Sequence, residues 1–297
     1  MRVHIAEACG FCYGVRRAVE LASTAEKGTH TLGPIIHNPQ LVNSLSARGV
    51  SPVDSLQDVA DGSKVLIRSH GVGPHVYEEA EAKHLDVVDA TCPHVKKAQQ
   101  DARKVINDKK ALIIVGEKDH PEVISISQWG CNRAIIIDKV EEAKEIPYCE
   151  HMGVVVQTTF SQSRFKQIES VLAEKTDDLD VYMTICTATR QRQEAAVELA
   201  KKVDAMIVIG GKNSANTGRL AQVCAEQGCP TYHVETASEL NVADFRGMSD
   251  IGVTAGASTP DWIIQEVVKM MEDLQAEGTE VMSEELLDQY DYEENPK

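Results

Sequence analysis

Three cysteines stand about a third of the chain apart, each at the same place in a repeated strand–cysteine–helix pattern: Cys12, Cys92 and Cys186. Segments 85–92 and 179–186 both read L-D-V-x-x-x-x-C, and residues 3–6 form a weaker apolar copy before the first cysteine. After each cysteine the apolar residues recur with a helical period, and a further apolar strand follows. Three widely separated thiols can meet only at the centre of a three-part fold. The pattern therefore predicts an α/β protein of three pseudo-repeated small parallel-sheet domains.

The repeat also predicts where these domains begin and end. We expect α/β repeats at residues 1–92, 93–186 and 187–276, followed by an acidic tail at 277–297. The tail carries much of the formal charge of −16, and an acidic run of this kind is typical of a solvated chain end.

Polar clusters follow the predicted strands at similar offsets from the preceding cysteine. Two clusters occur in each repeat, and ligands of parallel sheets bind beyond the carboxyl ends of the strands. Turn formation would explain any one cluster, whereas six at matching offsets favour one shared site. The residues that we expect at a central cavity are His37, His70, His120, Glu122, Thr158, Thr159, Ser214, Asn216 and Ser258.

Composition limits the classes of function. No apolar stretch approaches the roughly 18–20 residues that span a bilayer, and no signal peptide opens the chain, so we expect a cytoplasmic protein without a membrane partner. An acidic chain is a poor ligand for nucleic acid. Eight cysteines in a reducing compartment indicate metal or redox chemistry more than disulfides. Three thiolates at one point suit an iron–sulfur cluster with one iron left open for a substrate.

The cavity residues indicate an anionic ligand. His37, His70, Ser214, Asn216 and Ser258 are neutral or weakly basic donors, and helix N-termini add positive potential at the same strand ends. The two histidines can protonate near neutral pH and so carry charge to a phosphate. A carboxyl among such donors would repel the ligand unless it worked as a proton donor. Glu122 is therefore a candidate general acid, although a first-turn helix glutamate would look the same.

The same residues form motifs that resemble the 4-hydroxy-3-methylbut-2-enyl diphosphate reductases, the LytB/IspH family. The resemblance runs from about residue 3 to about residue 270. Each motif is weak alone, but together and in this order they are very specific. The motifs are Gly10–Val15, Ile36–Asn38, Ser69–Val72, Asp89–Pro93, Gly116–Val123, Gln157–Thr159, Cys186, Arg192–Ala195, Lys212–Ser214, Asn216 and Val253–Ser258.

The resemblance implies a [4Fe–4S] cluster held by Cys12, Cys92 and Cys186, with a [3Fe–4S] form expected after oxidation. It implies reductive dehydroxylation of an allylic diphosphate to isopentenyl and dimethylallyl diphosphates, the last step of the methylerythritol phosphate pathway. It further implies that ferredoxin or flavodoxin donates the electrons. By position, Glu122 would supply the protons, with His120 beside it as a catalytic residue, and Thr158 would orient the substrate hydroxyl and relay a proton. The diphosphate would be held by His37, His70, Ser214, Asn216 and Ser258, assisted by Thr159.

Two features depart from the family pattern and leave other functions open. Ala215 stands where the family often has a serine, and Cys9 forms an unusual C-x-x-C with Cys12. A thiol–disulfide oxidoreductase working through Cys9 and Cys12 would leave Cys92 and Cys186 unexplained. An iron–sulfur sensor would have no need of a proton donor such as Glu122. A dinucleotide dehydrogenase is disfavoured because no G-x-G-x-x-G follows a predicted strand.

Overall fold

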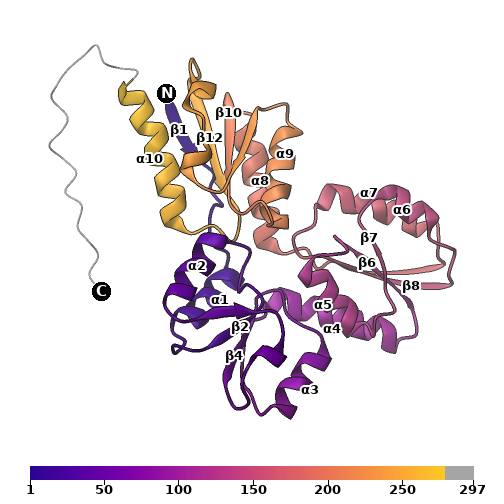
Figure 1. The fold of residues 1–297 in the computed structure, drawn as a ribbon. Helices are drawn as coiled ribbons and strands as arrows, with labels where there is room; N and C mark the ends of the chain where they lie inside the picture. The colour runs from indigo at the N-terminus through magenta and orange to yellow at the C-terminus, as the bar shows by residue number, and fades with distance from the viewer. Residues whose placement is uncertain (278–297) are drawn as a thin grey trace.

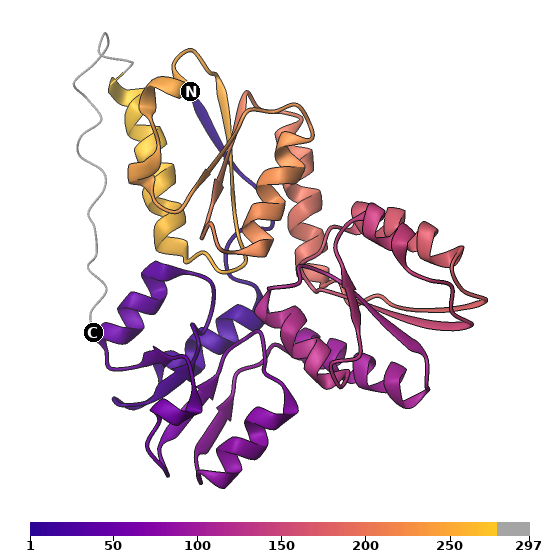
Figure 2. The same cartoon turned by 45° about the vertical axis from the view of Figure 1, so that its right-hand side comes forward.

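The computed structural model of the protein describes residues 1–277. In this part of the chain three domains surround a common centre, each built on a four-stranded parallel sheet flanked by helices (Figures 1 and 2). The predicted fold class, three similar parallel α/β domains, is confirmed. The tail predicted at 277–297 lies outside the described residues except for its first residue, Glu277.

The first domain has the strand order β3-β2-β4-β5. Its core lies between the sheet and α1, where Ala18 and Ala22 pack against Leu66 and against Ile35 and Ile36. Its elements are α1 (Tyr13–Ser23), β2 (His30–Leu32), α2 (Pro39–Ala47), β3 (Ser51–Val53), the 3-10 helix η1 (Leu56–Asp58), β4 (Lys64–Ile67), α3 (Pro74–Ala82) and β5 (Asp86–Asp89).

The second domain has the strand order β7-β6-β8-β9. Its two central strands are buried on both faces, as parallel strands covered by helices require, and this explains their near-continuous apolar sequence. Its elements are α4 (Pro93–Asn107), β6 (Ala111–Val115), α5 (Pro121–Trp129), β7 (Ile135–Ile137), α6 (Val140–Glu145), β8 (His151–Val156), α7 (Gln162–Ala173) and β9 (Asp178–Tyr182).

The third domain has the strand order β1-β12-β10-β11. Its elements are β1 (Arg2–Ile5), α8 (Thr187–Ala200), β10 (Ala205–Ile209), α9 (Ala215–Ala225), β11 (Thr231–Val234), the 3-10 helices η2 (Ala237–Glu239) and η3 (Val242–Phe245), β12 (Asp250–Ala255) and α10 (Asp261–Glu277). None of the helices in residues 1–277 is long and apolar enough to cross a membrane.

The placement of β1 corrects one prediction. Residues 2–5 do not open the first repeat, because β1 pairs in parallel with β12, with Val3 opposite Ile251. Figure 1 shows this indigo strand beside the orange strands of the third domain. The side chain of Val3 packs against the core of that domain, which fixes the strand there. The other boundaries, after residues 92 and 186, stay proposals.

With β1 assigned to the third domain, the three domains have the same arrangement of strands and helices around their cysteines. The strand before each cysteine is now an edge strand of one sheet, and the helix after it packs in the next domain: β1 and α1, β5 and α4, β9 and α8. Each cysteine therefore lies where the chain crosses from one domain to another, and the three crossings meet at the centre of the molecule.

Candidate active site at the junction of the three domains

The three cysteines occupy equivalent positions in the structure. Each is the N-cap residue of a helix, Cys12 of α1, Cys92 of α4 and Cys186 of α8. Each backbone N–H donates a hydrogen bond to a carbonyl at the end of the adjacent strand. The pairs are Cys12 with Ala257 (3.3 Å), Cys92 with Ser69 (2.9 Å) and Cys186 with Thr158 (2.9 Å). The backbone of each cysteine is thus hydrogen-bonded to a polar segment that follows a strand and that also supplies cavity residues, namely Ser258, His70 or Thr158.

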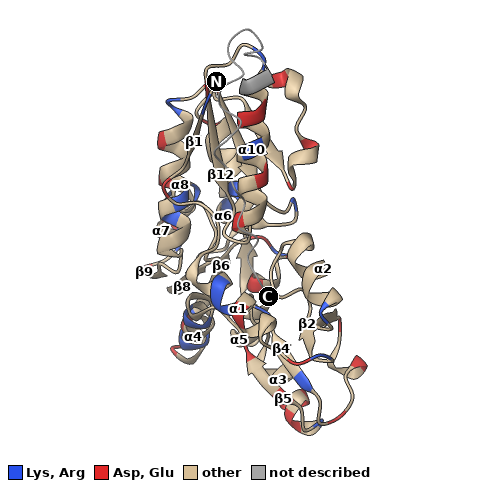
Figure 3. Cartoon of the chain, turned by 90° about the vertical axis from the view of Figure 1, so that its left-hand side faces the viewer, with Lys and Arg blue, Asp and Glu red and all other residues tan. Residues whose placement is uncertain are grey.

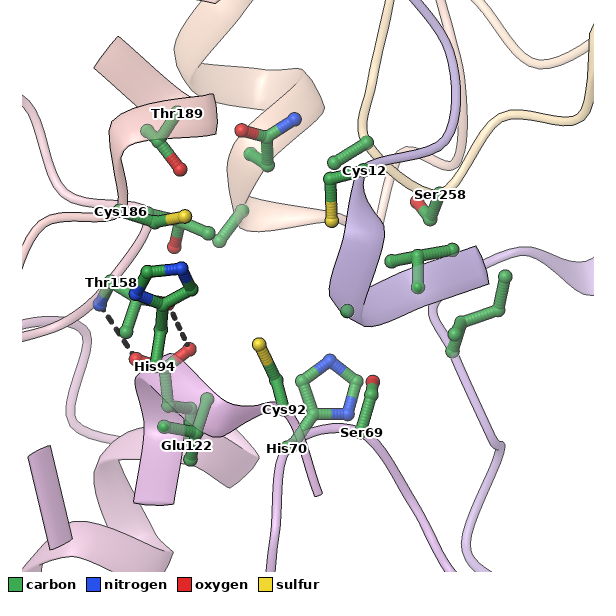
Figure 4. A pocket seen from close by; sticks show the side chains of 18 of the residues that line it. Cys12, Ser69, His70, Cys92, His94, Glu122, Thr158, Cys186, Thr189 and Ser258 are labelled. Carbon is green, nitrogen blue, oxygen red and sulfur yellow. Dashed lines mark hydrogen bonds between the residues drawn. The ribbon is translucent and has the colours of Figure 1, made fainter. Parts of the chain in front are cut away.

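All the predicted site residues line one cavity, and Figure 4 shows the three sulfur atoms around a common space. The helix that follows Cys12 approaches Cys92 closely, because a Cβ added to Gly14 would lie 2.5 Å from the Cys92 Sγ. Only glycine allows this approach. The full set is Cys12, His37, His70, Cys92, His120, Glu122, Thr158, Thr159, Cys186, Ser214, Asn216 and Ser258.

The sulfur ligands fit an iron–sulfur cluster. Burial raises the pKa of the Cys92 thiol to about 11, and the nearby Cys12 and Cys186 add to this rise, so three bare thiolates would be unfavourable together. Backbone N–H groups of the first helical turn partly offset the penalty. Soft thiolates that converge from three helix N-termini match the ligand set of iron–sulfur clusters, and iron would displace the thiol protons.

Glu122 lies in the first turn of α5 and is 2% exposed. Its Oε1 accepts a hydrogen bond from the Thr158 backbone N–H at 2.6 Å, and its Oε2 accepts one from Thr158 Oγ1 at 2.9 Å (Figure 4). Burial nevertheless raises the pKa of Glu122 to about 7, because it outweighs these two bonds. Glu122 can therefore hold a proton near neutral pH, which a carboxyl on an exposed helix end cannot do.

His120 is the N-cap residue of α5, and its Nδ1 accepts a hydrogen bond from the Glu122 backbone N–H at 3.1 Å. Burial, followed by the nearby His37 and Arg68, lowers the pKa of His120 to about 3. The ring is therefore neutral and carries its hydrogen on Nε2. His120 is thus a hydrogen-bond donor beside Glu122 and not a second acid.

His37, His70 and His120 form a compact cluster, with ring centroids 4.3 to 5.5 Å apart. Burial lowers the pKa of His37, and it lowers the pKa of His70 well below the usual range, with the neighbouring rings and Arg68 adding to the effect. In the free protein these shifts favour neutral rings, and the expectation that two histidines carry charge to a bound phosphate stays a prediction. The pKa values fall because the rings are shielded from water and lie near one another and near the positive charge of Arg68.

Several buried polar atoms in the cavity have no hydrogen-bond partner within the described residues. They are the two ring nitrogens of His37, Nδ1 of His70, and both side-chain amide atoms of Asn216. Unpaired buried donors are rare in native proteins, and they indicate a ligand that would satisfy them. Ser214 caps α9, the Ser258 hydroxyl donates to the His37 carbonyl at 3.1 Å, and Thr159 accepts from Gln157.

Two arginines, one buried and one partly buried, have roles at the site that the sequence did not predict. Arg192, on α8, is 5% exposed, and its Nη2 donates to the Gly10 carbonyl at 2.6 Å. Its guanidinium interacts electrostatically with the thiols of Cys12, Cys9 and Cys186. Arg68 is partly buried, and its positive charge helps to lower the pKa of all three histidines of the cluster. Arg68 directly precedes Ser69-His70, and Arg192 lies six residues after Cys186. These positions were the signal in the sequence, but sequence alone does not distinguish a buried arginine from a solvated one.

The other cysteines do not form a second thiol centre. Burial raises the pKa of Cys9 to about 11, and this side chain packs against the core of the third domain. A thiol of this kind is a poor nucleophile, which disfavours an oxidoreductase based on Cys9 and Cys12. All eight cysteines lie in the described part of the chain and are free, with Cys224 and Cys229 buried and Cys131 exposed.

Comparison with known proteins agrees with this geometry. The family model described as LytB protein matches residues 3–272. A relative from Pelobacter propionicus, named 4-hydroxy-3-methylbut-2-enyl diphosphate reductase, is 47% identical over 271 residues, which is 90% of this chain and 96% of that protein. A relative of the same name from Thermoanaerobacter sp. is 44% identical over 284 residues, 93% of this chain and 99% of that protein.

Two solved structures are also similar. The E-1-hydroxy-2-methyl-but-2-enyl-4-diphosphate reductase from Plasmodium falciparum has a TM-score of 0.86 and 27% identity, covering 90% of this chain and 87% of that one. A structure of (E)-4-hydroxy-3-methyl-but-2-enyl diphosphate reductase is described as the terminal enzyme of the non-mevalonate pathway. It has a TM-score of 0.66 and 43% identity, and the match covers 92% of this chain and 100% of that one. With a family model that spans nearly the whole described chain, the protein belongs to the LytB family.

Proposed function

We propose that this chain reduces (E)-4-hydroxy-3-methylbut-2-enyl diphosphate to isopentenyl and dimethylallyl diphosphates, the last step of the methylerythritol phosphate pathway. The balanced reaction consumes two electrons and two protons, breaks the C–O bond of the allylic alcohol and releases water. The observation that carries the proposal is that three cysteines, a buried carboxyl that can hold a proton and unpaired buried donors line the same cavity.

Cys12, Cys92 and Cys186 would hold a [4Fe–4S] cluster, whose fourth iron has no cysteine in this cavity and which is expected to lose that iron on oxidation. When bound, the cluster supplies electrons and a Lewis-acidic iron. The protein's contribution is to fix three thiolates at three helix N-termini. Arg192 adds a buried positive charge beside two of them, which offsets part of the negative charge of the thiolates.

Glu122 and Thr158 would handle the protons, with His120 positioning Glu122. With Glu122 protonated, its carboxyl hydrogen can pass to Thr158 Oγ1 along their 2.9 Å contact, while the threonine hydrogen passes to the substrate hydroxyl that leaves as water. The raised pKa of Glu122 keeps this carboxyl partly protonated near neutral pH. His120 holds the first turn of α5, and hence Glu122, in place through its Nδ1.

The diphosphate would bind at the unpaired donors of His37, His70 and Asn216, together with the hydroxyls of Ser214, Ser258 and Thr159. The N-terminus of α9, an 11-residue helix, adds backbone N–H groups and positive potential. Ala215 lines the cavity without a hydroxyl, so its contribution is limited to the backbone. Ferredoxin or flavodoxin would donate the electrons, one at a time.

The test compares Glu122→Gln with Glu117→Gln, which changes a nearby carboxyl whose side chain is 42% exposed. Both variants are purified without oxygen and assayed for substrate binding, iron content and turnover. We expect Glu122→Gln to bind substrate and iron normally and to lose turnover by roughly 10²–10⁴-fold, while Glu117→Gln keeps native turnover. Native turnover in Glu122→Gln would overturn its role, and a native protein that binds the substrate without consuming it would instead be a sensor.

A further inference from the structure

The three helices that begin at the cysteines share a second feature. The residue four positions after each cysteine is basic: Arg16 in α1, Lys96 in α4 and Arg190 in α8. The backbone N–H of each donates to the carbonyl of its cysteine, at 2.9, 3.0 and 3.1 Å respectively. Residues four apart lie on the same helix face, so each basic side chain lies one turn beyond a thiol. Three cations therefore surround the cysteine site.

These basic side chains reach solvent. Arg16 is exposed and has no carboxylate within ion-pair distance among residues 1–277. The Arg190 side chain is 51% exposed, with its closest carboxylate, Glu194, at 3.8 Å. Lys96 is half-exposed and pairs with Asp89 at 2.7 Å. The neighbouring Lys97 is exposed and pairs with Asp101 on its own helix. Arg16 and Arg190 are thus the cations least neutralised by the protein itself.

Exposed apolar side chains lie next to the same cysteines. Tyr13, which follows Cys12, is 71% exposed, and Met183, three residues before Cys186, is 49% exposed. Figure 3 shows Lys and Arg on α4 and α8 and beside α1. Exposed apolar side chains among charged ones are the usual composition of a transient protein interface. In a chain with a formal charge of −16, this basic surface is the natural place for an acidic partner.

We propose that this surface, formed by Tyr13, Arg16, Lys96, Lys97, Met183 and Arg190 and here called the cysteine-helix face, docks a small acidic electron-carrier protein. Two arguments select this occupant. Electron transfer slows steeply with distance, so a carrier must bind where the cysteines come nearest to the surface. The acidic remainder of the protein would repel an acidic carrier, and so would steer it to the basic face.

The proposal rests on the reductase function proposed above. Each docking event oxidises one carrier by one electron, and two events reduce one substrate. The two protons enter separately, by way of Glu122, and the hydroxyl oxygen leaves as water. The cysteine-helix face therefore has to bind a reduced carrier and release the oxidised one twice in each turnover, which favours a weak and electrostatically guided interface.

The test uses the double variant Arg16→Glu/Arg190→Glu and the matched control Lys27→Glu/Lys144→Glu, which makes the same charge change at two exposed lysines, one in the loop after α1 and one in α6. Turnover is measured with a reduced acidic ferredoxin and, separately, with reduced methyl viologen, a small reductant that needs no docking face. We expect about a tenfold rise in the KM for ferredoxin in the first variant only, with native turnover on viologen. For the native enzyme, the KM for ferredoxin should rise with salt.

The outcomes separate the two proposals. A native enzyme inactive with both reductants would refute the reductase function. A native enzyme active with both, together with a native KM for ferredoxin in Arg16→Glu/Arg190→Glu, would overturn the docking face. Loss of viologen turnover in that variant would also contradict it, because the side chains would then serve the site itself. Should the charge reversals prevent folding, Arg16→Gln/Arg190→Gln is the replacement, and a salt-independent KM for ferredoxin would equally count against the face.

Discussion

At the scale of single residues, Glu122 is the group whose charge the fold controls most clearly. Its pKa is raised to about 7, so between about pH 4.5 and 7 the folded protein binds more protons than the unfolded chain. Stability must therefore fall as pH rises through this window. The carboxylate is tolerated because Thr158 donates two hydrogen bonds to it, but these do not compensate for burial.

This gives a prediction that does not depend on turnover. Glu122→Gln removes the titration, so the melting temperature of the variant relative to the native protein should increase from pH 5 to pH 8. Thermal unfolding of both proteins at four pH values measures the difference. A difference that stays constant with pH would mean that the carboxyl is not held protonated in the fold.

The histidine cluster predicts proton uptake on ligand binding. His37, His70 and His120 are neutral in the free protein because burial lowers each pKa. A diphosphate placed among them favours the charged form and raises these pKa values. Calorimetric titration with isopentenyl diphosphate near pH 7, in buffers of different ionisation enthalpy, should show net proton uptake. Binding without proton exchange, or with proton release, would exclude this cluster as the charge-bearing part of the anion site.

Gly14 is important because it has no side chain where α1 approaches Cys92. Gly14→Ala would place a methyl group 2.5 Å from the Cys92 Sγ and displace that thiol or the start of α1. We expect anaerobically purified Gly14→Ala to bind clearly less iron than the native protein. Gly218→Ala is the control, because it adds the same methyl group at an exposed position of α9 with no atom within 4 Å. Equal iron content in the two variants would mean that the site tolerates the displacement.

At the scale of elements, the site depends on how α4 packs on the sheet of the second domain. Cys92 caps α4, and α4 rests on β8, where a Cβ at Gly153 would lie 2.5 Å from Val105. Thr158, which donates to Glu122, lies two residues beyond β8, so the packing of α4 on β8 helps to fix the position of Cys92 relative to Thr158. The absence of a side chain at Gly153 allows helix and strand to approach.

The contact can be tested by a double-mutant cycle. Gly153→Ala should destabilise the protein by about 1–3 kcal/mol through overpacking. Val105→Ala alone should also destabilise it, by leaving a cavity. The double variant should be more stable than the sum of the two effects predicts, because each change relieves the other. Chemical denaturation of the four proteins measures this coupling, and strictly additive effects would show that α4 and β8 do not constrain each other.

The strand β1 was assigned to the wrong domain from the sequence. Its apolar pattern and its position before Cys12 match β5 and β9, and so the strand itself could be predicted. Its partner could not, because pairing with β12 joins residues almost 250 positions apart along the chain. A short edge strand carries little information about its neighbour. The partner is selected by the apolar face of the third domain, which exists only after folding.

At the scale of the whole molecule, the site belongs to no single domain. The cysteines and polar clusters could be predicted because duplication repeats them at equal offsets, and parallel sheets place strand ends on the same side. Arg68, Arg192 and Gly14 could not, because their roles depend on how closely the domains approach at the centre. The neutral state of the histidines is likewise a product of burial between domains and not of residue type.

The central claim is that the three cysteines hold a cluster with one iron open to the substrate. The most direct test is Mössbauer spectroscopy of ⁵⁷Fe-enriched protein, purified without oxygen, with and without (E)-4-hydroxy-3-methylbut-2-enyl diphosphate. We predict a four-iron cluster in which one iron is distinct and changes when the diphosphate is added. A protein that cannot be reconstituted with iron and sulfide, or a cluster whose spectrum is indifferent to the diphosphate, would contradict the account.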